Sequence, residues 1–362
     1  MHMTATSALQ PGAILAKPIY SSNGNVLLAA GKELSAAMIQ RLLDLNVSQV
    51  YIDDPRTSDL IIEDAISEQT RARAMKVVYE TFSQMIESRK WVRSIANPRL
   101  GREFRGVFED ILYDLQSKKQ VMLQLTGIYT TDNYLYSHSV NVGIYSAALG
   151  MAVGLKRDEL IDLGIGAILH DIGKTMVPME ILLKPGRLTE EEYATMKQHA
   201  FFGYELLKDH ADIPLISAHC ALQHHERLDG SGYPRGLVGD QIHLYGQIVG
   251  IADVYDALTS NRIYRKAYLP HEALEILFAS TGQFDSDLIR KFRDNVALYP
   301  LGLTVTLNNG ELAVVVDINT RFPHRPILRV LKDADGTELT APREVDLSQD
   351  LTLMIVECEE IL

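Results

Sequence analysis

The sequence predicts a mainly α fold, in which an all-helical bundle follows a small N-terminal α+β unit and precedes a small C-terminal β appendage. Apolar residues recur at helical spacing from about residue 59 to residue 278, and the pattern changes to strand-like alternation after Tyr299-Pro300. Near the N-terminus, strand-like segments flank an Asn-Gly turn. We therefore expect four segments: an α+β domain at 1–56, a helical linker region at 57–124, a helical domain at 125–299 and the β appendage at 300–362.

Turn and cap signals define the N-terminal unit. Asn23-Gly24 is a typical two-residue hairpin turn, and Ser35 is a suitable N-cap for the helix that follows. We assign no element to the Met1-His2-Met3 start. Three strands are expected, at 13–20, 25–30 and 50–52.

The helical region begins with two long amphipathic stretches. The first runs from about Asp59 to Ile95, Asn97-Pro98 interrupts it, and the second continues the same period from Phe104 to Leu115. Because the first stretch exceeds what one small domain can cover, we expect a homodimer through these helices, with packing inside the chain as the alternative. Further along, Thr189 and Glu192 form a capping box that predicts a helix start.

The C-terminal appendage shows hairpin signals. Segments 303–307 and 311–318 flank the turn dipeptide Asn309-Gly310, and a second turn dipeptide lies at Asp335-Gly336. These signals predict short paired strands.

Composition excludes several classes of function. The formal net charge of −12 repels nucleic acid, so we expect no DNA or RNA duplex as partner, and an anionic ligand would need a local positive site. The longest nearly uncharged apolar stretch, Val142–Leu155, is too short to cross a bilayer, so no membrane contact is expected. Cys220 and Cys358 are the only cysteines, which favours a reducing compartment, the cytoplasm.

Histidines and carboxylates cluster in the helical middle of the chain, where seven of the eleven histidines fall between residues 138 and 225. His170-Asp171 pairs a nitrogen ligand with a carboxylate, and His224-His225 are adjacent. Asp253 lies in an apolar run, where an unpaired carboxylate would be costly to bury and a cation would remove that cost. Mixed imidazole and carboxylate ligands suit iron, manganese or zinc rather than calcium.

Three motifs in order resemble the HD-GYP family of the HD phosphohydrolase superfamily. They are His170-Asp171-Ile172-Gly173-Lys174, the run from His224-His225-Glu226 to Gly232-Tyr233-Pro234, and the run from Asp253 to Arg265. The resemblance covers about residues 125–298 and implies that 125–299 is an HD-type helical catalytic domain.

The resemblance implies a binuclear metal centre of iron or manganese, with zinc less favoured. Asp171 would bridge the two metals, as in other two-metal phosphoesterases. His210 and His219 match nothing in the family pattern and are expected to be structural. The implied metal ligands are His138, His170, Asp171, His199, His224, His225 and Asp253.

The implied activity is hydrolysis of cyclic di-GMP to pGpG by a metal-activated hydroxide, with further cleavage to GMP left open. Lys174 would stabilise the transition state or help to protonate the leaving 3′ oxygen. Arg262 and Arg265 match phosphate-contacting positions and would supply the local positive charge. Tyr233 would shape the substrate pocket or a partner surface, with docking to a diguanylate cyclase as one use of that surface.

Two alternatives stay open: an HD phosphohydrolase acting on another cyclic dinucleotide, and a non-catalytic protein that senses a nucleotide or docks a partner. One position also departs from a version of the family pattern. Some members hold a third metal through a glutamate one helical turn before the first histidine, and here that position is Tyr134, four residues before His138. A neutral phenol is a poor ligand for a hard cation. We therefore expect two metals and accumulation of pGpG.

Overall fold

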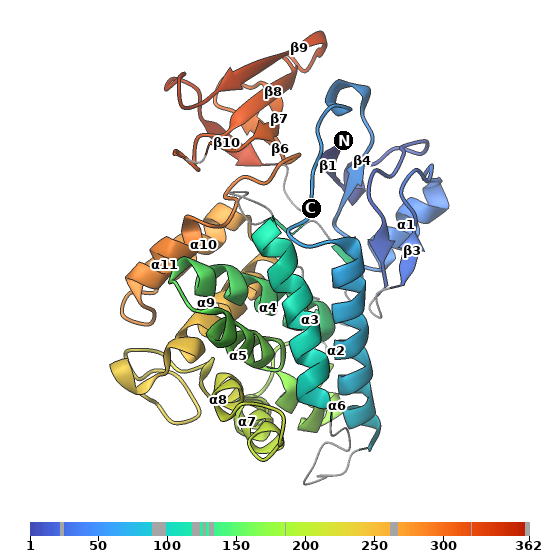
Figure 1. The fold of residues 1–362 in the computed structure, drawn as a ribbon. Helices are drawn as coiled ribbons and strands as arrows, with labels where there is room; N and C mark the ends of the chain where they lie inside the picture. The colour runs from blue at the N-terminus through green and yellow to red at the C-terminus, as the bar shows by residue number, and fades with distance from the viewer. Residues whose placement is uncertain are drawn as a thin grey trace.

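The computed structural model describes residues 1–21, 25–88, 99–117, 124–125, 128–129, 134–184, 186–260, 267–319 and 321–358. These residues form a helical body, an N-terminal α+β unit and a C-terminal β-sheet, coloured from blue to red along the chain in Figure 1. The predicted fold class is confirmed. Among the residues described, no helix is both long and apolar enough to cross a membrane.

The helical body is built around one cluster of buried apolar side chains, to which both its first and its last helix contribute. The predicted capping box starts one of these helices, because the Thr189 hydroxyl accepts from the Glu192 amide and the Glu192 carboxylate accepts from the Thr189 amide. The helices are α2 Glu68–Ser88, α3 Leu100–Ser117, α4 Tyr134–Ala152, α5 Arg157–Ile168, α6 Met179–Leu182, α7 Glu190–Leu207, α8 Leu215–Gln223, α9 Leu244–Thr259, α10 Pro270–Ala279 and α11 Ser286–Arg293, with 3₁₀ helices η4 Ile172–Met176 and η5 Gly239–Gln241.

The first amphipathic stretch is helical only from Glu68, so the prediction of a helix from Asp59 is wrong for residues 59–67. The reason is a cap that the sequence reading missed: the Ser67 hydroxyl accepts from the Thr70 amide and thereby starts α2. The apolar face of α2 packs inside the chain, where Val78 and Phe82 are fully buried against α3 and α4. This packing covers the surface on which the predicted homodimer was based, and dimerisation stays a prediction.

The N-terminal unit is confirmed as an α+β element with a strand more than expected, but the strand expected at 13–20 forms only at Ile19–Tyr20, and Ile14 and Leu15 make isolated bridges. The Ser35 hydroxyl accepts from the Met38 amide and caps α1 as predicted. The predicted turn at Asn23-Gly24 lies outside the described residues. The described elements are β1 His2–Ala5, η1 Thr6–Ala8, β2 Ile19–Tyr20, β3 Val26–Leu28, α1 Ala36–Asp44, β4 Gln49–Ile52 and η2 Pro55–Thr57.

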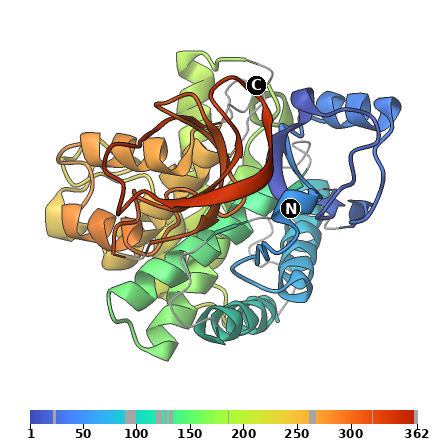
Figure 2. The same cartoon turned by 90° about the horizontal axis from the view of Figure 1, so that it is seen from above.

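Strand β1 lies at the N-terminal start, to which no element was assigned from the sequence. It pairs antiparallel with β4, and its Met3 backbone also contacts the C-terminal sheet, because the Met3 amide donates to Gly302 O and Met3 O accepts from the Thr304 hydroxyl. The two terminal units therefore contact each other. In the view from above, the C-terminal sheet lies over the helical body and the N-terminal unit lies beside it (Figure 2).

The C-terminal sheet has five antiparallel strands in the order β10-β6-β7-β8-β9. Both predicted turns are present, and Gly310 and Gly336 adopt positive φ angles of 87° and 80°, which a side chain would strain. The strands are β6 Thr304–Leu307, β7 Leu312–Asp317, β8 Ile327–Lys332, β9 Glu338–Asp346 and β10 Ile355–Cys358. A further short strand, β5 Ile128–Tyr129, pairs parallel with β2 in the N-terminal unit.

Candidate metal centre

The seven predicted ligands come together at the centre of the helical body, from five different segments. Helices α4, α7 and α9 each supply one side chain, the junction between α5 and η4 supplies two adjacent side chains, and the end of α8 supplies two more. Most of these side chains are almost fully buried. In chain order they are His138, His170, Asp171, His199, His224, His225 and Asp253.

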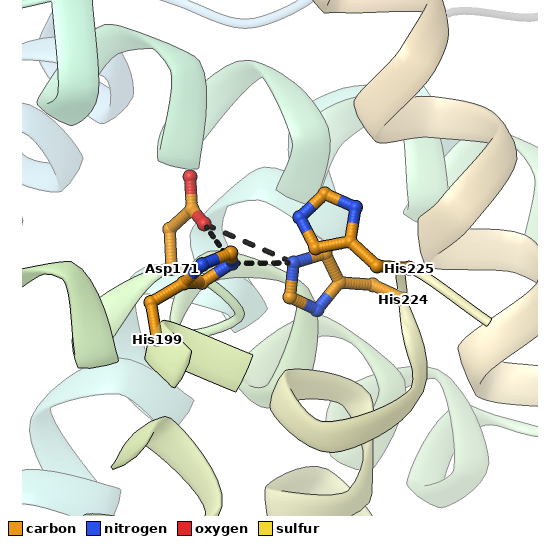
Figure 3. Close-up of side chains that lie close together, drawn as sticks. All are labelled: Asp171, His199, His224 and His225. Atoms are coloured by element: carbon orange, nitrogen blue, oxygen red, sulfur yellow. Dashed lines mark hydrogen bonds and ion pairs between the residues drawn. The ribbon is translucent and has the colours of Figure 1, made fainter. Parts of the chain in front are cut away.

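Asp171 belongs to two groups of ligand atoms, and each group is compact enough to hold one cation. The first group is Asp171 with His199, His224 and His225, and the second is Asp171 with His138 and His170. Figure 3 shows the first group, in which Asp171 Oδ1 lies 3.4 Å from His199 Nε2 and 3.8 Å from His224 Nε2. The other carboxylate oxygen, Oδ2, lies 3.3 Å from His170 Nε2 and 3.7 Å from His138 Nε2. One carboxylate thus faces both groups.

Asp253 contacts histidines of both groups from the side of α9. Its Oδ1 lies 3.1 Å from His138 Nε2 and 4.0 Å from His170 Nε2, while its Oδ2 lies 3.7 Å from His225 Nδ1. A buried carboxylate among imidazole nitrogens adds an anionic donor to a site whose other donors are mostly neutral.

Backbone carbonyls orient three of the imidazoles. The Nδ1 atoms of His170, His199 and His224 lie 2.7, 2.7 and 3.1 Å from carbonyl oxygens three or four residues earlier. A carbonyl only accepts, so each Nδ1 donates and carries the proton. The lone pair of each ring is therefore on Nε2, the atom that faces Asp171, which is the usual arrangement of metal-ligating histidines.

Two buried atoms at this point have no hydrogen-bond partner among the described residues, namely His170 Nε2 and Asp171 Oδ1. Leaving a buried polar atom unsatisfied costs about 1–3 kcal/mol. Both atoms belong to the ligand groups, and a cation within those groups would satisfy both. The residues present therefore fit a divalent metal ion.

The protonation states of His199, His224 and Asp171 also suit metal binding. Burial lowers the pKa of His199 to about 4 and that of His224 to about 3, so both rings are neutral near pH 7. Burial alone would raise the pKa of Asp171, but Lys174 and His170 outweigh it and hold the pKa of this carboxyl well below its usual value. Neutral imidazoles and an ionised carboxylate are the forms that ligate metals.

Asp256 was missed by the sequence reading, although it lies on the same face of α9 as Asp253, three residues further on. Its Oδ2 lies 2.7 Å from His138 Nδ1 and so directs His138 Nε2 toward the centre. Burial lowers the pKa of His138, but the hydrogen bonds to Asp253 and Asp256 outweigh burial and raise this pKa to about 9, so a cation that binds this ring would have to displace a proton. The sequence could have indicated Asp256, because it lies three residues after the predicted ligand Asp253.

Close backbone packing of η4 against α7 brings Asp171 to His199. Gly173 permits it, because a Cβ atom at this position would lie 2.0 Å from His199 O and 2.4 Å from Gly203 N. The next residue, Lys174, is 22% exposed and donates from Nζ to Asp171 Oδ2 over 2.5 Å. Lys174 therefore places a positive charge at the edge of the centre.

The loop that carries Tyr233 is held over the centre by a buried carboxylate. Glu226 accepts from the amides of Arg235 and Leu237 at 2.8 and 2.9 Å. The Tyr233 ring stacks on His225 with centroids 4.6 Å apart. Lys197 Nζ lies 5.1 Å from the centroid of the Tyr193 ring and 5.8 Å from that of the Tyr233 ring, so it adds a cation beside Tyr233.

The remaining predicted residues lie apart from the centre or outside the described chain. Arg262 and Arg265 are not among the described residues, and Tyr134 begins α4 without a described side chain. His210 Nδ1 lies 2.6 Å from Asp212 Oδ1, and the His219 ring contacts the Tyr204 ring. Neither histidine belongs to the ligand groups.

Comparisons with known proteins agree with this arrangement. Residues 115–288 match the HD domain family, and residues 304–361 match the KOW domain associated with HD domain. The chain is 31% identical over 334 residues to a cyclic di-GMP phosphodiesterase of Pseudomonas aeruginosa, a match that covers 87% of this chain and 81% of the relative. It is 48% identical over 132 residues to a cyclic di-GMP phosphodiesterase response regulator of Xanthomonas campestris, covering 36% of this chain and 35% of that protein.

One solved structure shares the fold. An HDG"Y"P protein from Bdellovibrio bacteriovorus superposes with a TM-score of 0.52 and 19% identity, covering 81% of this chain and 98% of that chain. The Pseudomonas relative matches nearly the whole chain, and the three motifs lie within the HD domain match. The chain therefore belongs to the HD-GYP family of phosphodiesterases, within the HD-domain hydrolases.

Proposed function

We propose that this protein hydrolyses cyclic di-GMP to pGpG at a binuclear centre of divalent metal ions. The observation that carries this proposal is the pair of buried ligand groups that share Asp171. The choice of substrate is supported by the relatives from Pseudomonas and Xanthomonas, both of which are named cyclic di-GMP phosphodiesterases.

The donor set favours iron or manganese. Five imidazoles and two carboxylates form a mixed nitrogen and oxygen environment without thiolate, since both cysteines lie outside the ligand groups. When bound, two divalent cations would lower the pKa of a water molecule toward neutrality and offset negative charge on the phosphoryl oxygens. The residues that would hold them are His138, His170, Asp171, His199, His224, His225 and Asp253.

The protein's own groups would bind and orient the anionic substrate. Lys174 is held at the edge of the centre by Asp171, where its ammonium group can neutralise a phosphoryl oxygen or donate a proton to the leaving 3′ oxygen. Tyr233 and Lys197 form an aromatic and cationic rim beside His225, suited to a nucleotide. We propose that Arg262 and Arg265 contact phosphate, because they match family positions with that role.

The two cysteines bear on the cellular compartment. Cys220 and Cys358 are both free and buried, which is compatible with a reducing compartment, and we propose the cytoplasm. We also propose a homodimer, and docking of a diguanylate cyclase beside Tyr233.

A turnover assay with matched variants tests this function. Full-length protein is incubated with cyclic di-GMP and either Mn²⁺ or Fe²⁺, and products are separated by chromatography. We expect pGpG from the wild type and from His219→Ala, whose histidine lies outside the ligand groups, and no product from His199→Ala. If the protein hydrolyses a different cyclic dinucleotide but not cyclic di-GMP, the proposed substrate is wrong. Full activity of His199→Ala would overturn the proposed centre.

A further inference from the structure

A line of hydrogen bonds leads away from His138 and ends at the start of α2. His138 Nδ1 lies 2.7 Å from Asp256 Oδ2, and Asn141 Nδ2 donates to Asp256 Oδ1 over 2.9 Å. Arg71 Nη1 then donates to Asn141 Oδ1 over 3.2 Å, and Arg71 Nη2 donates to Asp64 Oδ1 over 2.7 Å. These side chains come from α9, α4 and α2, and from the segment before α2.

Two charged members of this line, Asp256 and Arg71, are buried, whereas charged side chains usually lie at the surface. Asp256 is 2% exposed and Arg71 is 5% exposed. Burying a guanidinium group costs several kcal/mol before its bonds are counted, and apolar residues of similar volume are often as stabilising as a buried ion pair. The energy of folding alone therefore gives no strong reason for a buried arginine at this position.

The geometry gives Arg71 a more specific task. An asparagine amide can rotate by half a turn, which exchanges its oxygen and its nitrogen. Arg71 only donates, so it holds Asn141 with Oδ1 toward itself and Nδ2 toward Asp256. In the opposite orientation, the amide oxygen would face the carboxylate of Asp256 and repel it. Arg71 therefore helps to fix the direction of the carboxylate that holds His138, together with the Ser260 hydroxyl, which donates to Asp256 Oδ2 over 3.3 Å.

We propose that Arg71 is a positioning residue for His138, acting through Asn141 and Asp256. This inference rests on the proposed function, because His138 is a ligand only if the metal centre exists. A carboxylate that orients a ligating histidine commonly contributes 10- to 100-fold to metal affinity. Arg71 reaches Asp256 only through Asn141. We therefore expect loss of Arg71 to lower metal affinity by an amount near the lower end of this range, about 10-fold.

The other end of Arg71 is anchored where the three parts of the protein meet. Asp64 precedes Ala65, whose amide donates to Gln124 O, and the Gln124 side chain accepts from the Leu301 amide at 2.9 Å and donates to Leu301 O at 3.1 Å. Leu301 lies just before the C-terminal sheet. The anchor is therefore a packed junction, which gives Arg71 a defined position.

The test is a thermodynamic cycle on manganese affinity, measured by competition with a chelator. The variants are Arg71→Met, Asn141→Ala and the double variant, all in the full-length chain. The matched control is Arg73→Met, which removes an arginine of the same helix that pairs with Asp110 at the surface. Thermal unfolding of each metal-free variant separates loss of stability from loss of affinity.

We expect Arg71→Met and Asn141→Ala each to weaken manganese binding about 10-fold. The double variant should bind as weakly as Asn141→Ala alone, because Arg71 acts through Asn141, and Arg73→Met should bind as the wild type does. Wild-type affinity in Arg71→Met, or additive losses in the double variant, would overturn the proposal. If Arg71→Met does not fold, undiminished affinity in Asn141→Ala overturns it equally. A wild type that binds no manganese would instead contradict the proposed metal centre itself.

Discussion

Gly173→Ala is a small change with a large expected effect on the centre. The added Cβ would lie 2.0 Å from His199 O, whereas ordinary contact begins at 3.4 Å, so η4 and α7 would have to separate by about 1.4 Å. Neither neighbour can rotate away, because both close atoms belong to the backbone of α7. Overpacking of this kind costs about 1–3 kcal/mol of folding free energy. The separation also moves Asp171 from His199, and a misplacement near 1 Å can cost about 100-fold in rate.

The matched control for this prediction is Gly106→Ala on α3. There a Cβ would meet only the end of the exposed Arg73 side chain, at 3.0 Å, and alanine is favoured over glycine in a helix by up to about 1 kcal/mol. Chemical denaturation and metal analysis are run on both variants. We expect Gly173→Ala to lose stability and metal, and Gly106→Ala to keep both. A Gly173→Ala protein with wild-type stability and metal content would refute the reasoning about close packing.

Three further predictions concern substrate, metal number and assembly. Arg262→Ala should raise KM for cyclic di-GMP by the equivalent of about 1.5–3 kcal/mol without changing metal content, because a phosphate contact lies outside the coordination shell; unchanged KM and rate would rule out this role. Anomalous scattering should show two metals and none beside Tyr134, and a third metal would contradict this count. The product pGpG should accumulate before any GMP, and direct conversion to GMP would contradict this claim. Light scattering at micromolar concentration tests the expected homodimer, whose interface would have to lie outside the apolar face of α2 that packs within the chain; a monomeric mass would decide against dimerisation.

The parts of the fold that were predicted correctly depend on local signals. The Ser35 cap and the Gly310 and Gly336 turns are each specified within a few residues, and the structure contains them all. The motif residues were also found, because the family resemblance links positions far apart in the chain. The structure brings their side chains into two groups around Asp171, an arrangement that the motif spacing alone does not describe.

Apart from the Ser67 cap, the parts that were missed depend on contacts between distant residues. Asp256 and its partner His138 are 118 positions apart, and Arg71 and Asn141 are 70 positions apart. Strand β1 is defined by pairing with β4, almost fifty residues later, and four residues at the N-terminus have no periodicity that could reveal such pairing. The spacing from Asp253 could have pointed to Asp256, but its pairing with His138, the contact between Arg71 and Asn141, and strand β1 follow only when the helices and strands are placed in space.

Metal analysis of protein purified without oxygen tests the central claim most directly. Wild type and His219→Ala should each hold two equivalents of iron or manganese per chain. Asp171→Ala should hold none, with the helical circular dichroism unchanged, because Asp171 is the one residue common to both ligand groups. Two equivalents of metal retained in Asp171→Ala, or a wild type with a single equivalent after reconstitution, would contradict a binuclear centre bridged by this carboxylate.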